Sequence, residues 1–212
     1  VIVSTGTKTL QDQLFHRDLP RVRETLGARL KSALLKGRAN YLCWYRLDQT
    51  VKEGTLPNKS DVVLLSRVRA WFSRKASGDI GEVEGVPEDA TLWPRLTSNA
   101  ENCLGAECPF HDDCFVVKAR RAAQEADVVV VNHHLLFADL SIKREGFGEI
   151  LPGAHAFVLD EAHQIPELAG QFFSIAVSAR QLTELEADAL REAAAEGGAK
   201  AALEGLGREV ER

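Results

Sequence analysis

Uninterrupted apolar runs mark three places where the chain is predicted to form strands. The first run, VIVST, covers residues 1–5, and the second contains the four valines at 128–131. Both are short and β-branched, which is typical of strands covered on both faces of a sheet. The third run, at 157–159, ends directly in acidic residues. We therefore predict three buried strands, the last of which delivers polar side chains to one end of the sheet.

Apolar residues at helical spacing predict helices between these strands. Leu10, Leu14 and Phe15 predict a helix after the first strand, which Pro20 should end or kink. A leucine stripe further along predicts a second helix that stops at Gly37. The stripe consists of Leu26, Leu30, Leu34 and Leu35.

Further helices are predicted over 61–75 and 114–126, and the chain turns helical after Gln164. The alternation of strands and helices is that of an α/β protein with a parallel sheet. The segment from about 40 to 120 has no clear strand pattern. We therefore predict that this segment is inserted into the α/β fold.

The composition is that of an ordinary globular protein, with 45% apolar and 27% charged residues among 212. The net charge of −5 argues against a uniformly basic nucleic-acid binder, although cations between residues 16 and 75 leave room for a local basic face. No apolar run approaches the roughly 20 residues of a membrane span, so no membrane partner is expected.

Two acids follow the third predicted strand. Open parallel sheets bind ligands at the carboxyl ends of their strands, where Asp160 and Glu161 would lie. In many ATPases an acid in this position holds Mg²⁺, and the next acid polarises the attacking water as a general base. We therefore predict Asp160 as the Mg²⁺ residue, Glu161 as the base, and His163 as a contact that links ATP state to domain closure. The competing interpretation is a solvated acidic turn.

Two features suggest that the sequence is an interior piece of a longer protein. It contains no Met and opens abruptly on VIVST. It also lacks a G-x-x-x-x-G-K-[ST] phosphate loop, so it holds half of an ATP site. We expect the loop to precede Val1, and we expect this piece alone to hydrolyse ATP poorly.

Four cysteines supply a second group of candidate chemistry. Cys43 stands alone, whereas Cys103, Cys108 and Cys114 follow with the spacing C-x₄-C-x₅-C. Without a secretory context, clustered cysteines bind metal more often than they form disulfides. Four thiolates suit either zinc or an iron–sulfur cluster, and the lack of a tight C-x₂-C pair favours the cluster. His111 could replace a cysteine at zinc, and four unrelated thiols are the remaining alternative.

The segment that carries the cysteines is rich in polar residues and is expected to have little core of its own. Metal–sulfur bonds should then supply the missing folding energy, so Cys108→Ser should unfold the insert and spare the valine-rich sheet. Aromatic residues interleaved with Arg and Lys are expected to form a rim facing DNA, unless they fill the core of the insert. They are Tyr41, Trp44, Tyr45, Trp71 and Trp93.

Five motifs occur in an order that resembles the DinG/YoaA branch of the XPD-like superfamily 2 DNA helicases. They are VIVSTGTKTLQDQL, LKGRANYLCWYRL, the spaced cysteines, VVVVNHHLLFADL and FVLDEAH. The resemblance extends to about residue 180. It implies a RecA-like motor domain 1 of the P-loop NTPase type at 1–37 and 122–166, a mostly helical iron–sulfur domain at 38–121, and the start of an all-helical Arch domain at 167–212.

The resemblance also implies roles for individual residues. Thr5, Thr7 and Lys8 match a motif that contacts the backbone of single-stranded DNA. The run from Asp160 to His163 matches the DEAH box. Cys43, Cys103, Cys108 and Cys114 match the four ligands of a [4Fe–4S] cluster.

Asn132 and His133 follow the valine strand at its carboxyl end. They are therefore predicted to reach DNA or ATP. The alternative is that His133 is a satisfied turn residue.

The leading hypothesis is an ATP-dependent 5′→3′ DNA helicase that couples ATP hydrolysis to movement on single-stranded DNA in repair or replication. Its expected partners are ATP with Mg²⁺, single-stranded and forked duplex DNA, and replication or repair proteins in the cytoplasm of a bacterium. The alternative is a non-motor module that binds zinc or an iron–sulfur cluster in a structural or redox role. A third hypothesis is a related ATPase that translocates without unwinding, or one fused to a nuclease.

Overall fold

The computed structural model describes residues 1–174, apart from 28, 55, 57, 73–76, 88 and 147, together with residue 189. Residues 1–172 form one compact unit and residues 173–212 a second. The predicted Arch segment at 167–212 therefore lies mostly outside the described residues. Its described part is the helix α8 (Ile165–Phe173) with Ser174 and residue 189.

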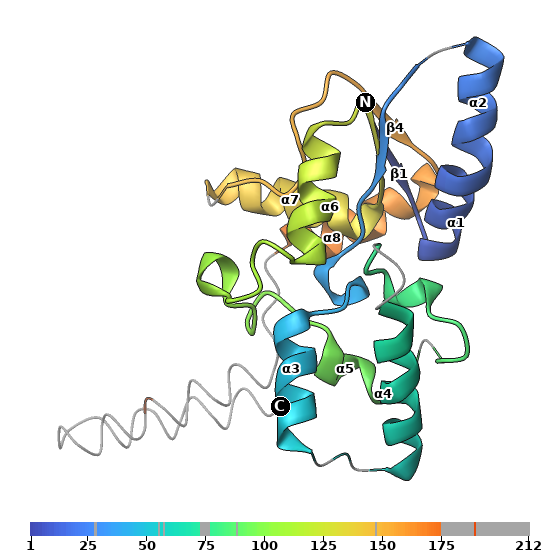
Figure 1. Cartoon of the computed structure of the whole chain (residues 1–212). Coiled ribbons are helices and arrows are strands. Elements are labelled where there is room, and N and C mark those ends of the chain that lie inside the picture. The colour runs from blue at the N-terminus through green and yellow to red at the C-terminus, as the bar shows by residue number, and fades with distance from the viewer. Residues whose placement is uncertain are drawn as a thin grey trace. The chain divides into compact units, whose positions relative to one another are not determined.

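A parallel sheet of four strands forms the first layer of the unit, which confirms the α/β prediction (Figure 1). Its strand order is β2–β3–β1–β4. The strands are β1 (Ile2–Thr5), β2 (Ser32–Leu34), β3 (Val128–Asn132) and β4 (Phe157–Leu159). The valines of β3 are buried on both faces, as their uninterrupted run predicts.

The prediction of a helix on the leucine stripe was wrong. The preceding helix, α2 (Leu19–Leu26), ends at Gly27, which adopts the left-handed conformation with φ of 60°. The chain then pairs as β2 with β3, placing Ser32 opposite Val128 and Leu34 opposite Val130. Pairing with a distant strand thus overrides the local helical spacing.

Pro20 neither ends nor breaks its helix. The helix α1 (Lys8–Gln13) continues through a π-helical turn (Leu14–Asp18) into α2, with Pro20 in the first turn of α2. The wide turn is closed by the Leu19 N–H, which donates to the Leu14 carbonyl five residues back. Pro20 is tolerated because it lies in the first turn of α2, where the backbone N–H that proline lacks is not needed for a hydrogen bond within α2.

β4 also differs from its prediction as a buried strand. It lies at the edge of the sheet and pairs with β1, and its three apolar residues are 44–52% exposed. The apolar run predicted the strand correctly but not its position in the sheet.

Short helices build the region between β2 and β3. The helix α4 (Lys59–Phe72) covers the described part of the helix predicted over 61–75, and α6 (Phe115–Gln124) confirms the helix predicted over 114–126. The helices of the unit after β2 are α3 (Trp44–Glu53), α4 (Lys59–Phe72), α5 (Trp93–Leu96), α6 (Phe115–Gln124) and α7 (His133–Glu145). Single 3₁₀ turns occur at Arg38–Asn40, Ile80–Glu82, Gly105–Glu107 and Ala162–Gln164. No helix in the described part of the chain is both long and apolar enough for a membrane crossing.

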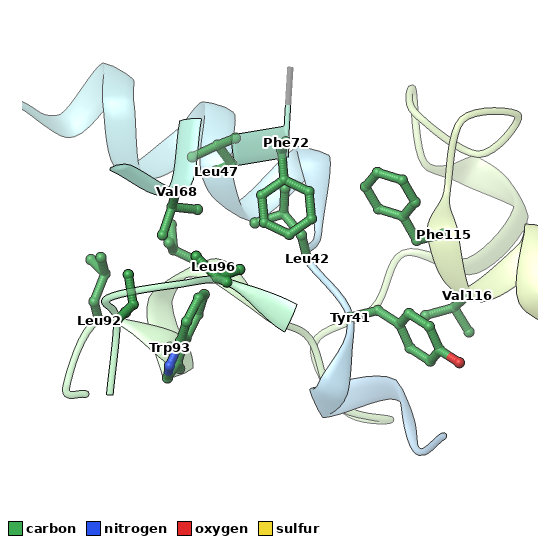
Figure 2. Packing of buried hydrophobic residues seen from close by; sticks show 12 residues of the cluster. Tyr41, Leu42, Leu47, Val68, Phe72, Leu92, Trp93, Leu96, Phe115 and Val116 are labelled. Atoms are coloured by element: carbon green, nitrogen blue, oxygen red, sulfur yellow. The ribbon is translucent and has the colours of Figure 1, made fainter. Parts of the chain in front are cut away.

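The insert has a substantial core, contrary to the expectation from its polar composition. Its buried cluster includes Phe72 of α4 and Phe115 of α6 (Figure 2). Trp44 of α3 packs against both of these rings, and the three ring centroids lie 5.3–6.3 Å apart. Tyr41 and Trp93 are also buried in it. The aromatic residues thus fill the core to a large extent instead of forming a DNA-facing rim.

A second, smaller cluster lies against the sheet. It consists of Ile2, Ala33, Leu35, Ala123, Val129, Val131, Leu136 and Leu151. Ala119 of α6 packs against both clusters, so α6 connects the two cores.

Candidate functional site

The carboxyl ends of β1, β3 and β4 meet at one edge of the sheet. Asp160, which follows β4, is held there by two hydrogen bonds with β1, in one of which it accepts and in the other of which it donates. The Thr5 hydroxyl donates to Asp160 Oδ2 over 3.0 Å, and the Asp160 amide donates to the Ser4 carbonyl over 2.9 Å. The Asp160 side chain is nevertheless exposed, so its carboxylate is both positioned and accessible.

His133, the first residue of α7, supports this edge from inside. Its side chain is fully buried, with Nδ1 2.7 Å from the Ser4 hydroxyl and Nε2 2.8 Å from the Asp160 carbonyl. Because a carbonyl can only accept, Nε2 must donate, and in the neutral ring Nδ1 then accepts from the Ser4 hydroxyl. Burial lowers the pKa of His133, although the bond to the Asp160 backbone opposes that shift. The histidine is therefore a neutral link between β1 and the acidic turn.

Glu161 has an unusual backbone conformation. With φ of 50°, it is the one non-glycine residue with positive φ in the described part of the chain. Such strain concentrates at functional sites, where surrounding structure enforces it. The Glu161 carboxylate lies 3.3 Å from Nδ1 of the exposed His163. The acidic turn thus presents Asp160, Glu161 and His163 together, as the sequence predicted.

Of the three residues predicted to contact the DNA backbone, two are exposed. Lys8 is exposed, and so is Thr7, whose side chain caps α1 by accepting from the Leu10 amide over 3.2 Å. Thr5 is fully buried against Asp160. Thr5 and His133 are thus buried and support the acidic turn, and their contacts with DNA or ATP stay a prediction.

Lys8 lines two hollows on the surface. One hollow, of about 580 Å³, is also lined by Thr7, Asn132 and His134. The other, of about 420 Å³, is lined by polar residues of the insert that include Asn99 and Asn102. Asn132 also caps α7, since its side-chain oxygen accepts from the Leu135 amide over 2.9 Å. The two hollows adjoin at Lys8, and their linings combine polar groups of the sheet edge and the insert with apolar side chains such as Leu135 and Trp93.

The four cysteines line a single cavity of about 260 Å³. Cys43 comes from the start of α3 and Cys114 from the start of α6, while Cys103 and Cys108 come from the loop before α6. All four are unpaired thiols. Cys43 thus lies around the same cavity as Cys103, which is 60 positions away in the sequence. Four cysteines with unrelated roles would have no reason to share a cavity.

Helix ends and backbone amides near the cysteines favour thiolates, whereas the burial of Cys43 opposes them. Cys43 and Cys114 are the N-cap residues of ten-residue helices, whose N-terminal ends favour negative charge. Burial raises the pKa of the Cys43 thiol, and the backbone N–H groups of Arg46 and Tyr45 act in the opposite direction. The Gly105 amide donates to Cys103 Sγ over 3.4 Å.

Among the described residues, no group of three or more His, Cys, Asp or Glu side chains is placed to hold a single metal ion. A tetrahedral zinc site needs its four ligands within about 2.3 Å of one point. An iron–sulfur cluster occupies more space, and its ligands stand further apart. The cysteines around the shared cavity supply four thiols, the number of protein ligands that either group takes.

Sequence reasoning missed a buried charge that joins the sheet to the insert. Lys36 is 5% exposed, and its ammonium lies 2.7 Å from Asp12 of α1 and 2.6 Å from Asp79 of the insert. Burial opposes the charged form, but the two carboxylates outweigh burial and leave the pKa of Lys36 raised. No sequence signal marks the pairing, because the partners are 24 and 43 residues away.

Comparison with known proteins shows extensive similarity to bacterial helicases. The chain is 51% identical to the ATP-dependent DNA helicase YoaA of Haemophilus influenzae, over 87% of this chain and 29% of the relative. It is 52% identical to the ATP-dependent DNA helicase YoaA of Escherichia coli, over 89% and 30%. It is 38% identical to the ATP-dependent helicase DinG of Mycobacterium tuberculosis, over 84% and 28%. The chain thus spans less than a third of the length of these relatives. No protein-family model matches it.

Proposed function

We propose, from the premise that this chain belongs to the DinG/YoaA-type helicases, that it is part of motor domain 1 of an ATP-dependent 5′→3′ DNA helicase. The observation that carries the proposal is the hydrogen bond from Thr5 to Asp160. Thr5 lies two residues before Thr7, where the DNA-contacting surface begins, and Asp160 opens the DEAH box. One strand end therefore joins the nucleotide-binding acids to the nucleic-acid surface.

The acidic turn has the residues that ATP hydrolysis needs from this part of the site. Mg²⁺ bound with ATP would neutralise phosphate charge, and the exposed Asp160 carboxylate is the residue that would hold it. Glu161 would accept the proton of the attacking water. His163, which lies exposed beside Glu161, would contact a second domain.

Movement of Asp160 would be transmitted through short polar links. The Asp160 backbone bonds to Ser4 and to His133, and the carboxylate bonds to Thr5. A change at the nucleotide would therefore displace the end of β1 and, with it, Thr7 and Lys8. This arrangement supports the coupling of ATP hydrolysis to movement on single-stranded DNA.

The surface around Lys8 is the proposed path of the single strand. Lys8 supplies a cation for phosphate, while Thr7, Asn132, Asn99 and Asn102 supply hydrogen-bonding groups. Salt should weaken such binding steeply because phosphate contacts release counterions. Forked duplex DNA is the proposed natural substrate, with repair or replication proteins in the bacterial cytoplasm as partners.

The cysteine cavity is the proposed site of a [4Fe–4S] cluster. Cys43, Cys103, Cys108 and Cys114 would hold it through their thiolates. A cluster there would fasten the cysteine loop to the starts of α3 and α6, and so would fix the insert surface that adjoins the DNA path.

The test is Glu161→Gln in the full-length protein. Hydrolysis stimulated by single-stranded DNA should fall by about 100-fold or more, because the general base is lost. Binding of a single-stranded oligonucleotide should persist, and duplexes with a 5′ tail should be unwound only by the unmodified enzyme. Glu167→Gln, which changes an exposed acid of α8, is the matched control.

Unchanged hydrolysis in Glu161→Gln would contradict the assignment of the base. Unwinding only from a 3′ tail would contradict the direction. Metal binding without hydrolysis or single-strand affinity would identify the alternative, a non-motor metal-binding module.

A further inference from the structure

The cysteine cavity contains two cations as well as four thiols. Arg38, from the 3₁₀ turn at Arg38–Asn40, and Arg120, from α6, both line it. Both are half-buried. No hydrogen bond or ion pair in the described part of the chain engages either guanidinium group, so the two positive charges lack carboxylate partners there.

Arg120 is distinguished from the other cations of α6. Lys118 is exposed and pairs with Asp113 over 3.0 Å. Arg121 is exposed and does not line the cavity. Only Arg120 therefore carries its charge from α6 to the cysteines.

A desolvated guanidinium without a partner is costly. Burial, in the first place, and repulsion by Arg38, in the second, lower the pKa of Arg120. Cys103 and Cys114 oppose that shift. Asp139 acts in the same direction as the cysteines, although it already pairs with Lys143. The cavity thus holds positive charge whose cost would be offset by negative charge among the cysteines.

We infer that Arg120 is a positioning residue that supplies counter-charge to the thiolate-bound cluster and raises its reduction potential. The inference rests on the proposed function, because it requires the cluster. When an external one-electron reductant such as dithionite reduces the cluster, one electron enters it and no bond to the protein changes. The added negative charge is stabilised by a nearby guanidinium, so the reduced form becomes more favourable.

The test is a reductive titration of the full-length protein, followed by visible absorption and electron paramagnetic resonance, with iron and sulfide measured in each sample. In Arg120→Gln, the ratio of reduced to oxidised cluster at a fixed potential should fall about tenfold, which is about 59 mV for a one-electron couple. Arg120→Lys keeps the charge, so the reduction potential of its cluster should fall by less than half as many millivolts as in Arg120→Gln. Arg121→Gln makes the same charge change on the same helix outside the cavity and should match the unmodified protein.

An Arg120→Gln cluster with an unchanged potential would overturn the inference while leaving the proposed cluster intact. Equal shifts in Arg120→Gln and Arg121→Gln would also overturn it, because the effect would then be one of net charge. If Arg120→Gln retains no cluster, Arg120→Lys decides: a retained cluster of near-normal potential supports the role of the charge, and its loss refutes it. An unmodified protein without sulfide would refute the proposed cofactor itself.

Discussion

The parallel sheet and the cysteine-bearing insert reach stability by different means. The sheet is held by adjacent strands and a small cluster of eight buried apolar residues, and its functional edge is fixed by hydrogen bonds between residues more than 100 positions apart. The insert buries a larger cluster of twelve, drawn from four helices and the loops between them. The sheet therefore depends on long-range polar links at its working edge, whereas the insert depends on side-chain packing.

This difference changes the role expected of the cysteines. They lie around a cavity at the side of the aromatic core, and only Cys114 packs against the core. A cluster would therefore order the cysteine loop, at about 98–114, more than it would hold α3 and α4 together. Accordingly, Cys108→Ser should release the loop while the aromatic core persists, in contrast to the expectation from composition.

The largest predicted effect comes from the charge that joins the two regions. Lys36→Met leaves Asp79 buried without its partner, which should lower the free energy of unfolding by about 3–5 kcal/mol. Native-state hydrogen exchange should show the loss in both α4 and β3, because Lys36 contacts α1 and the insert together.

Lys118→Met is the matched control for that change. It removes another Lys–Asp pair, but one with side chains that are 50% and 76% exposed, so the cost should stay below about 1 kcal/mol. Equal effects of the two substitutions would show that Lys36 does not bridge the regions.

A smaller effect, confined to the insert, is predicted for Gly78→Ala. Gly78 has φ of 70°, and an added Cβ would lie 2.1 Å from Cγ of the buried Phe115 ring. Backbone strain and overpacking should together cost about 2–4 kcal/mol. Hydrogen exchange should accelerate in α3 and α4, and β3 should be unaffected.

Gly54→Ala separates strain from packing. Its φ is 66°, but no described atom lies within 4 Å of the added Cβ, so about 1–2 kcal/mol of strain alone is expected. A Gly78→Ala cost no larger than that of Gly54→Ala would contradict the claim that packing holds the insert.

The smallest predicted effect is a pH dependence confined to the sheet. The pKa of His133 is lowered from 6.5 on folding, so the unfolded chain binds a proton more readily. The contribution of His133 to the free energy of unfolding is fully present above pH 6.5 and is lost as the pH falls towards the lowered pKa of the folded state. Denaturation midpoints at pH 7.5 and 5.5 should show the loss. His133→Gln should remove that part of the slope, whereas the exposed His155→Gln should retain it. A slope unchanged in His133→Gln would contradict the buried neutral link.

Much of the sheet was predictable because its signals are local. The valine run of β3 predicts a buried strand, and the acids after β4 predict a polar strand end. Neither prediction needs information from the rest of the chain. β2 was missed because its three residues become a strand only by pairing with β3. The insert core was underestimated because its members are scattered from Tyr41 to Val116 over four helices and the loops between them, so no single local pattern predicts the cluster.

The candidate site was predictable in its residue types but not in its geometry. The spacing of the cysteines and the sequence DEAH identified the reactive groups. That Thr5 faces Asp160, that His133 is buried, and that Arg120 shares the cysteine cavity depend on pairing across the fold. Such contacts leave no trace in the order of residues.

The most direct test of the account is the content of iron and acid-labile sulfide in the full-length protein, purified without oxygen, beside Cys108→Ser prepared in the same way. The account predicts about four iron and four sulfide per chain in the unmodified protein, with both strongly reduced in Cys108→Ser. One zinc ion per chain without sulfide would contradict it.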